Sequence, residues 1–61
     1  MKVLICDDEY HVIQAIRLLV PWQQLGINHI FTASSVTESM EIIRREAPQL
    51  VITDIVMDDQ N

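Results

Sequence analysis

The chain has 61 residues, of which 49% are hydrophobic, with one glycine, two prolines and one cysteine. This length allows at most one domain, and the apolar content excludes a disordered tail and a collagen-like repeat. An internal disulfide is excluded because Cys6 is the only cysteine. A chain of this length buries only about 60% of the surface that its unfolded form exposes. A hydrophobic content of 49% is therefore high for the length.

The net charge is −5, from nine acidic and four basic residues. A nucleic-acid-binding surface would be basic, and a membrane span would need about 18 or more consecutive apolar residues, which the sequence lacks. The apolar stretch at residues 1–6 meets two acids too early for a signal peptide. Together with the unpaired thiol, these features predict a cytoplasmic protein with no membrane partner.

The first predicted elements are a strand and a helix. Val3–Cys6 is a continuous apolar run, which is typical of a strand covered on both faces in a parallel sheet. A helix is predicted over residues 9–20, and Pro21 ends it. Leu18 lies off the apolar stripe of this helix, which predicts a second contact on another side. The predicted stripe consists of Val12, Ile13, Ile16, Leu19 and Val20.

A connector over residues 21–28 contains the only glycine, and a second strand is predicted at 30–33. Ser35 and Glu38 then have the spacing of a capping box, which predicts the start of a second helix. Pro48 ends that helix. Its predicted core face consists of Val36, Met40, Ile43 and Ala47.

A third apolar run, Leu50–Thr53, completes the order strand, helix, strand, helix, strand. This alternation predicts right-handed βαβ units and a parallel sheet, in which functional groups gather at the carboxyl ends of the strands. Asp7 and Asp8 follow the first strand and Asp54 follows the third. If these strands are neighbours, the three carboxylates meet.

Three close carboxylates repel one another, and a divalent cation relieves the repulsion. Mg²⁺ prefers oxygen ligands, and a carboxylate beside it can act as a nucleophile toward phosphorus. The acids can equally be residues that begin loops and cap helices, and Asp8 is placed to cap the first helix. The residues alone leave both interpretations open.

Two blocks of this sequence resemble one family. Residues 2–9, Lys-Val-Leu-Ile-Cys-Asp-Asp-Glu, resemble the opening of the receiver domain of two-component response regulators. Residues 50–57, Leu-Val-Ile-Thr-Asp-Ile-Val-Met, resemble its phosphoacceptor strand and the loop that follows. The connector 21–27 is similar to the Trp-x-x-Leu-Gly stretch of receivers fused to AraC-type output domains. The resemblance implies an α/β fold, a flavodoxin-like (CheY-like) doubly wound parallel sheet truncated to its first five elements.

The same resemblance implies a role for each matching position. Asp54 would accept a phosphoryl group from a sensor histidine kinase and would also be a metal ligand. Asp8 would bind Mg²⁺ directly, Asp7 through water, and the backbone carbonyl of Val56 would be a further ligand. Glu9 is expected to stabilise the helix dipole instead of binding the ion. The domain would be a signalling phosphoacceptor and not an enzyme.

Two departures from the family are visible. Asp58 stands where the family usually has proline, which loosens the loop and adds charge beside an acidic site. The family also has five βα units, so residues 1–61 would be the N-terminal part of a receiver, without strands 4 and 5, helices 3 to 5 and the output domain. Contact with DNA would then occur only through that absent C-terminal domain. The Ser or Thr and the Lys that contact the phosphoryl group would also be absent.

These departures predict that the segment alone is a poor phosphoacceptor. The third strand would become an open edge, which predicts a dimer or higher oligomer formed through that edge or through the open face of the sheet. An alternative function is therefore an interaction module that needs no phosphorylation.

Another alternative is a Mg²⁺-dependent phosphotransferase or phosphatase, but an Asp-x-Asp after the first strand and a glycine-rich loop are both missing from the sequence. Cys6 is interpreted as a buried strand residue, and His11 and His29 as solvated side chains, since no second Cys or His is spaced with them as a zinc site requires.

Overall fold

The computed structural model describes residues 1–54, which form a parallel sheet covered by two helices. The elements in chain order are β1 (Lys2–Cys6), α1 (Tyr10–Leu19), β2 (His29–Ala33), α2 (Val36–Glu46) and β3 (Leu50–Thr53). The predicted β-α-β-α-β order is confirmed. The predicted ends of β1, α1 and β2 differ from the observed ends by no more than one residue.

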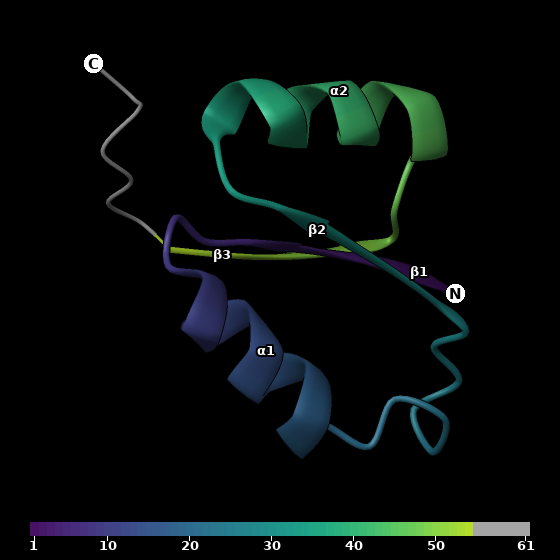
Figure 1. The fold of residues 1–61 in the computed structure, drawn as a ribbon. Helices are drawn as coiled ribbons and strands as arrows, with labels where there is room; N and C mark the ends of the chain where they lie inside the picture. The colour runs from purple at the N-terminus through teal and green to yellow at the C-terminus, as the bar shows by residue number, and fades with distance from the viewer. Residues whose placement is uncertain (55–61) are drawn as a thin grey trace.

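Strand β1 lies in the middle of the sheet, whose order is β2-β1-β3. Both neighbours run parallel to it, with α1 on one face of the sheet and α2 on the other (Figure 1). Val3, Leu4 and Ile5 of this strand have no exposed surface. The continuous apolar run is therefore explained by a strand that is covered on both faces. The strand order is that of the first three strands of the flavodoxin-like doubly wound fold.

The core on the α1 side is built from β1 and the connector after the helix. Val3 and Ile5 pack against Ile13, and the connector adds Trp22 and Ile27 to the same cluster. Trp22 is held in place because its indole Nε1 donates to the carbonyl oxygen of Arg17 at 2.9 Å. The connector therefore closes the end of the core that α1 does not reach.

The predicted stripe of α1 is too wide. Ile13, Ile16 and Val20 face the sheet, but Leu19 is 81% exposed. Leu18 is 84% exposed, so the second contact predicted for it is not made within residues 1–54. The physical reason is that a helix on one sheet buries a narrow face, and Leu18 and Leu19 lie outside it.

The core on the α2 side joins Leu4, Cys6, Ala33 and Ile42. The prediction for this helix is partly wrong, because Met40 is exposed while Ser39 and Ile42 are buried. Ser39 tolerates burial because its hydroxyl donates to the carbonyl oxygen of Ser35 at 2.8 Å and lies 2.9 Å from the Cys6 sulfur. The buried face is thus centred one residue before the predicted face, while Val36 and Ile43 pack against the core as predicted.

Ala47, also predicted for that face, is exposed and lies beyond the helix, as its C-cap. Its φ of 48° is in the left-handed region that often ends helices. Pro48 follows, so the helix ends where the sequence predicts.

The serine half of the capping box at the start of α2 is confirmed, and the glutamate half is shifted by one residue. The Ser35 hydroxyl oxygen accepts from the Glu38 backbone N–H at 3.1 Å. The Glu38 carboxylate accepts from the backbone N–H of Ser34 at 2.8 Å, one residue before the N-cap. The first bond satisfies a backbone donor that a helix N-terminus otherwise leaves without a partner, and the second holds the residue before the cap.

The end of α2 is tied to the start of β1 by charge. Arg45 Nε lies 3.0 Å from one Glu46 carboxylate oxygen, and Lys2 Nζ lies 3.3 Å from the other. A hydrogen bond from Arg45, and to a smaller extent one from Lys2, lowers the pKa of Glu46 below its ordinary value. The C-terminal end of α2 is thereby placed over the amino ends of the strands.

The cap of α2 gives a stability test. Replacing Ser35→Ala removes the bond to the Glu38 N–H and should lower the free energy of unfolding by about 1 kcal/mol. Denaturation by urea, followed by circular dichroism, measures this. The control is Thr37→Ala in the first turn, an exposed position where alanine is the better helix former. Equal losses in both variants would contradict the capping role.

Candidate functional site

The backbone brings the acids that follow β1 and β3 to one point. Cys6 pairs with Thr53, so the residues that follow each of them lie side by side at the carboxyl edge of the sheet. The Asp54 N–H donates to the Cys6 carbonyl at 3.2 Å, and the Asp7 N–H donates to the Ala33 carbonyl at 3.0 Å. Both aspartates are therefore fixed by sheet hydrogen bonds that extend one residue past the strands.

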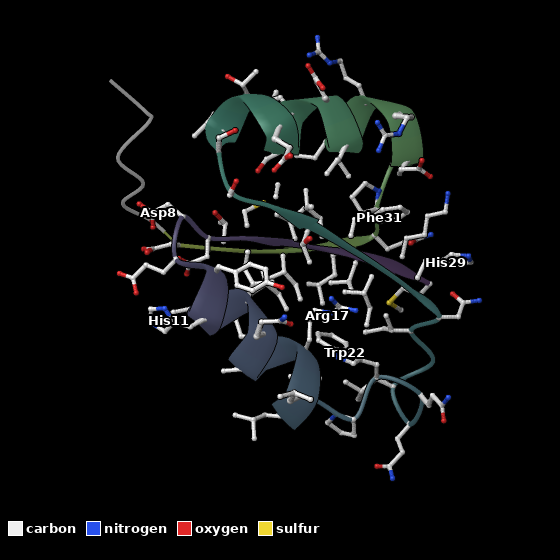
Figure 2. All side chains as sticks on the ribbon, viewed as in Figure 1. Asp8, His11, Arg17, Trp22, His29 and Phe31 are labelled. Carbon is white, nitrogen blue, oxygen red and sulfur yellow. The ribbon has the colours of Figure 1, made fainter. Side chains whose placement is uncertain are left out.

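The predicted cluster of carboxylates is present. One carboxylate oxygen each from Asp7, Asp8 and Asp54 can be chosen so that all three lie within 4.8 Å of one another. Asp7 is only 8% exposed, whereas Asp8 and Asp54 are exposed. Figure 2 shows Asp8 at the end of the molecule opposite to His29, beside the first turn of α1. The cluster is therefore open to solvent on one side and anchored on the other.

Asp7 is held by the turn that follows β1. Its Oδ1 accepts the backbone N–H of Glu9 at 2.9 Å, which leaves the second carboxylate oxygen for another partner. Such a bond from a side chain to the backbone two residues on stabilises the turn between strand and helix. The turn therefore determines how the Asp7 carboxylate is oriented.

The spacing of the oxygens can be compared with the needs of a cation. Mg²⁺ binds oxygen at about 2.1 Å in an octahedron, so two ligands on opposite sides of the ion are about 4.2 Å apart. Oxygens within 4.8 Å of one another fit this after a small side-chain movement, or with one carboxylate bound through water. Mg²⁺ commonly uses one or two carboxylates and keeps several waters. The donor set therefore fits a hard divalent cation.

The alternative reading of Asp8 as a helix cap is not what the structure shows. The N-cap of α1 is Glu9, and α1 has no side-chain cap hydrogen bond. The Glu9 carboxylate instead lies 3.1 Å from His11 Nε2. Glu9 precedes the first turn, which holds no acidic residue, so its expected contribution to the helix dipole stays a prediction.

Of the remaining residues singled out from the sequence, Val56 and Asp58 lie outside the described residues. Cys6 is buried and forms no disulfide within residues 1–54, and His11 is exposed, as predicted. His29 is also exposed, but it begins β2 instead of lying in the connector.

The contact that the sequence did not reveal is the one between Ser39 and Cys6, which joins α2 to the residue before Asp7. A signal was present, since Ser39 lies three residues after Val36 and three before Ile42. A polar residue at a helix position that faces a sheet is the pattern that would have indicated this contact.

Comparison with known proteins agrees with this geometry. Residues 3–61 match the family described as the response regulator receiver domain. The chain belongs to this family, whose members are signalling domains. Neither helix within residues 1–54 has the length and hydrophobicity that a membrane crossing requires.

Individual relatives with similar sequences support the same family. An uncharacterized response regulatory protein of Staphylococcus epidermidis is 42% identical over 60 residues, which are 98% of this chain and 24% of that protein. Transcriptional regulatory protein HptR of Staphylococcus aureus is 40% identical over 60 residues, with the same coverage of 98% and 24%. The chain thus spans about a quarter of the length of these relatives. No solved structure matches it with significance.

The carboxylate cluster predicts opposite effects of one substitution with and without metal. Asp8→Asn removes one of three neighbouring charges, so it should raise the unfolding temperature in EDTA. It should also weaken Mg²⁺ binding by about tenfold or more, and so reduce the stabilisation that added Mg²⁺ provides. Thermal unfolding at increasing MgCl₂ concentrations measures both effects.

The matched control is Glu9→Gln, which removes an adjacent charge that lies outside the cluster. It should leave the dependence on MgCl₂ nearly unchanged. The prediction of a cation site is wrong if added MgCl₂ raises the unfolding temperatures of Asp8→Asn and Glu9→Gln by the same amount.

Proposed function

We propose that this chain is the phosphoacceptor segment of a two-component response regulator, with Asp54 as the acceptor. The observation that carries this proposal is the meeting of Asp7, Asp8 and Asp54 at the carboxyl edge of the sheet in a receiver-family chain. The phosphoryl donor is a phosphohistidine of a sensor histidine kinase. The proposal rests on the position of Asp54 at the end of β3 and on the exposure of its side chain.

In the proposed reaction, a carboxylate oxygen of Asp54 attacks phosphorus. The bond from phosphorus to the imidazole nitrogen of the donor breaks, and that nitrogen keeps the electron pair. The product is an acyl phosphate on Asp54 and a neutral histidine on the kinase, after the nitrogen takes a proton. Exposure of the Asp54 side chain lets a donor approach, while the bond from its N–H to Cys6 holds the backbone still.

We propose Asp7, Asp8, Asp54 and the backbone carbonyl of Val56 as the residues that hold Mg²⁺. When bound, the ion neutralises the negative charge of the carboxylates and of the transferring phosphoryl group. Asp8 is exposed at the carboxyl edge of the sheet, within the cluster of three carboxylates, which suits a direct ligand. Asp7 is held through Oδ1 by the turn, which suits a bond through water.

We also propose that residues 1–61 act as the N-terminal part of a longer cytoplasmic regulator. The support is that the relatives are about four times as long, since the matched 60 residues are 24% of each. One relative is named a transcriptional regulatory protein, which supports a DNA-binding output domain outside this chain. An AraC-type output is the form that the Trp22 connector favours.

A second candidate function, an interaction module independent of phosphorylation, is favoured by the third strand. Leu50 is 44% exposed and Val51 is 40% exposed, and β3 has only β1 as a neighbour within the described sheet. Open strand edges pair with other strands. Self-association as a dimer or higher oligomer through this edge or through the open face is therefore part of the proposal for the chain alone.

Phosphorylation tests the first function. Acetyl phosphate with Mg²⁺ should add one phosphoryl group to a longer protein that carries this segment, and peptide mass spectrometry should place it on Asp54. Asp54→Asn should abolish the addition, and Asp8→Asn should slow it at least about tenfold through loss of metal. Glu9→Gln is the control and should react at close to the original rate.

An addition that persists in Asp54→Asn would contradict the assigned acceptor. Absence of any addition, together with self-association that acetyl phosphate does not change, would favour the interaction module.

A further inference from the structure

A hollow lies between the last turn of α1, the connector that follows it and the start of β2, and the phosphoacceptor proposal makes no use of it. Its volume is about 620 Å³, which is within the range of about 300–1,000 Å³ that small-molecule sites occupy. It is lined by Arg17 of α1, by Ile30 of β2 and by residues of the connector between them. Figure 2 shows Arg17 and Trp22 near each other, on the side of the sheet where α1 lies.

The hollow lies beside β2, which is an outer strand both in this sheet and in the family's complete sheet. The order here is β2-β1-β3, and the flavodoxin-like order is 2-1-3-4-5. The further strands of a longer receiver would therefore lie beyond β3, on the other side of the sheet from the hollow. The hollow is at the amino end of β2, about 15 Å from the carboxylate cluster, which is the length of this five-residue strand.

The floor of the hollow is apolar and held in place by the core. Trp22 and Ile27 are buried members of the cluster on the α1 side, and Ile30 packs against the same cluster. The bond from the Trp22 indole to the Arg17 carbonyl oxygen fixes the orientation of the ring. Such a floor would receive the apolar body of a ligand without ordering further side chains, which lowers the entropic cost of binding.

Two lining residues offer hydrogen-bond donors that the described chain does not use. The Arg17 side chain is exposed, and its guanidinium makes no ion pair or hydrogen bond within residues 1–54. The Asn28 side-chain oxygen accepts from the amino group of Met1 at 3.0 Å, which leaves the amide nitrogen available to donate. The polar part of the hollow is therefore suited to a ligand that accepts hydrogen bonds.

The charges of the chain are segregated, and the hollow lies in the part without acids. Residues 10–37 contain no Asp or Glu, although the chain has nine acidic residues, and Arg17 is the only Lys or Arg in the same stretch. The acids of α2 lie on the other face of the sheet (Figure 1). The positive charge of Arg17 is therefore not balanced by the elements that form the hollow, and a ligand anion would supply the missing partner.

We propose that this hollow binds a small organic carboxylate, a molecule with one carboxylate group on an aromatic or aliphatic body. The carboxylate accepts hydrogen bonds from Arg17 and Asn28, and the body lies against Trp22, Ile27 and Ile30. A planar guanidinium matches the two oxygens of a carboxylate with two parallel N–H bonds. One guanidinium balances one carboxylate, whereas a phosphate monoester carries nearly two charges at neutral pH. This site is therefore distinct in chemistry and in place from the phosphoryl site at the other end of the sheet.

The fluorescence of Trp22 tests the site, because Trp22 is the only tryptophan in the chain. Phenylpropionate, added to the 61-residue chain, should change the Trp22 emission in a saturable way. Arg17→Gln should weaken this binding about tenfold, through loss of the charge-assisted hydrogen bonds. Phenylpropionamide, a neutral analogue of the same shape, should bind the original chain about tenfold more weakly than the acid and should not distinguish it from Arg17→Gln.

The matched control is Arg44→Gln, which removes an exposed arginine of α2 on the other face of the sheet and should bind phenylpropionate as the original chain does. Circular dichroism checks that both variants keep their helices. Calorimetric titration of a longer protein that carries this segment, with and without Arg17→Gln, repeats the measurement in a complete domain.

Three outcomes would overturn the proposal. Equal affinities for phenylpropionate and its amide would show that the hollow takes apolar molecules without regard to charge. An affinity for phenylpropionate that Arg17→Gln leaves unchanged, or that Arg44→Gln lowers equally, would place the anion elsewhere. Absence of saturable binding in both the chain and the longer protein would exclude the hollow as a ligand site.

Discussion

The structure depends on the pairing of β1 with a parallel strand on each side. That central position buries Val3, Leu4 and Ile5 completely, and each face of β1 supplies the base of one core cluster. The same pairing sets the register of Cys6 against Thr53, and that register brings Asp7 and Asp54 together. Hydrophobic burial and the geometry of the acidic site are therefore two results of one hydrogen-bonded ladder.

The sequence predicted what depends on local pattern. The continuous apolar run of β1, the capping box at Ser35 and the stop at Pro48 each act over a few residues, and each was placed within about one residue. The meeting of the acids was predictable because parallel strands share a carboxyl edge. The site residues at positions 55–61 lie outside the described residues, so the part of the prediction that concerns Val56 stays a prediction.

The errors concern how helices face the sheet. A stripe drawn on an isolated helix counts every apolar residue within an arc, but contact with a flat sheet is limited to a narrower face, so Leu19 is left exposed. On α2, a serine occupies a position that contacts the sheet, where a hydrophobic pattern leads one to expect an apolar residue. Ser39 can be buried there because its hydroxyl donates to the Ser35 carbonyl oxygen and to the Cys6 sulfur. Whether a polar side chain meets partners in three dimensions is not contained in a hydrophobic pattern.

The Asp7 carboxylate has a consequence for the thermodynamics of ion binding. Its orientation is fixed during folding by the Glu9 N–H, and its burial restricts the rotamers that it can adopt. The loss of conformational entropy for this side chain therefore belongs to the folding step, and it would add nothing to the cost of binding a cation at the proposed site. The acidic edge is in this sense preorganised at Asp7 before any ion arrives.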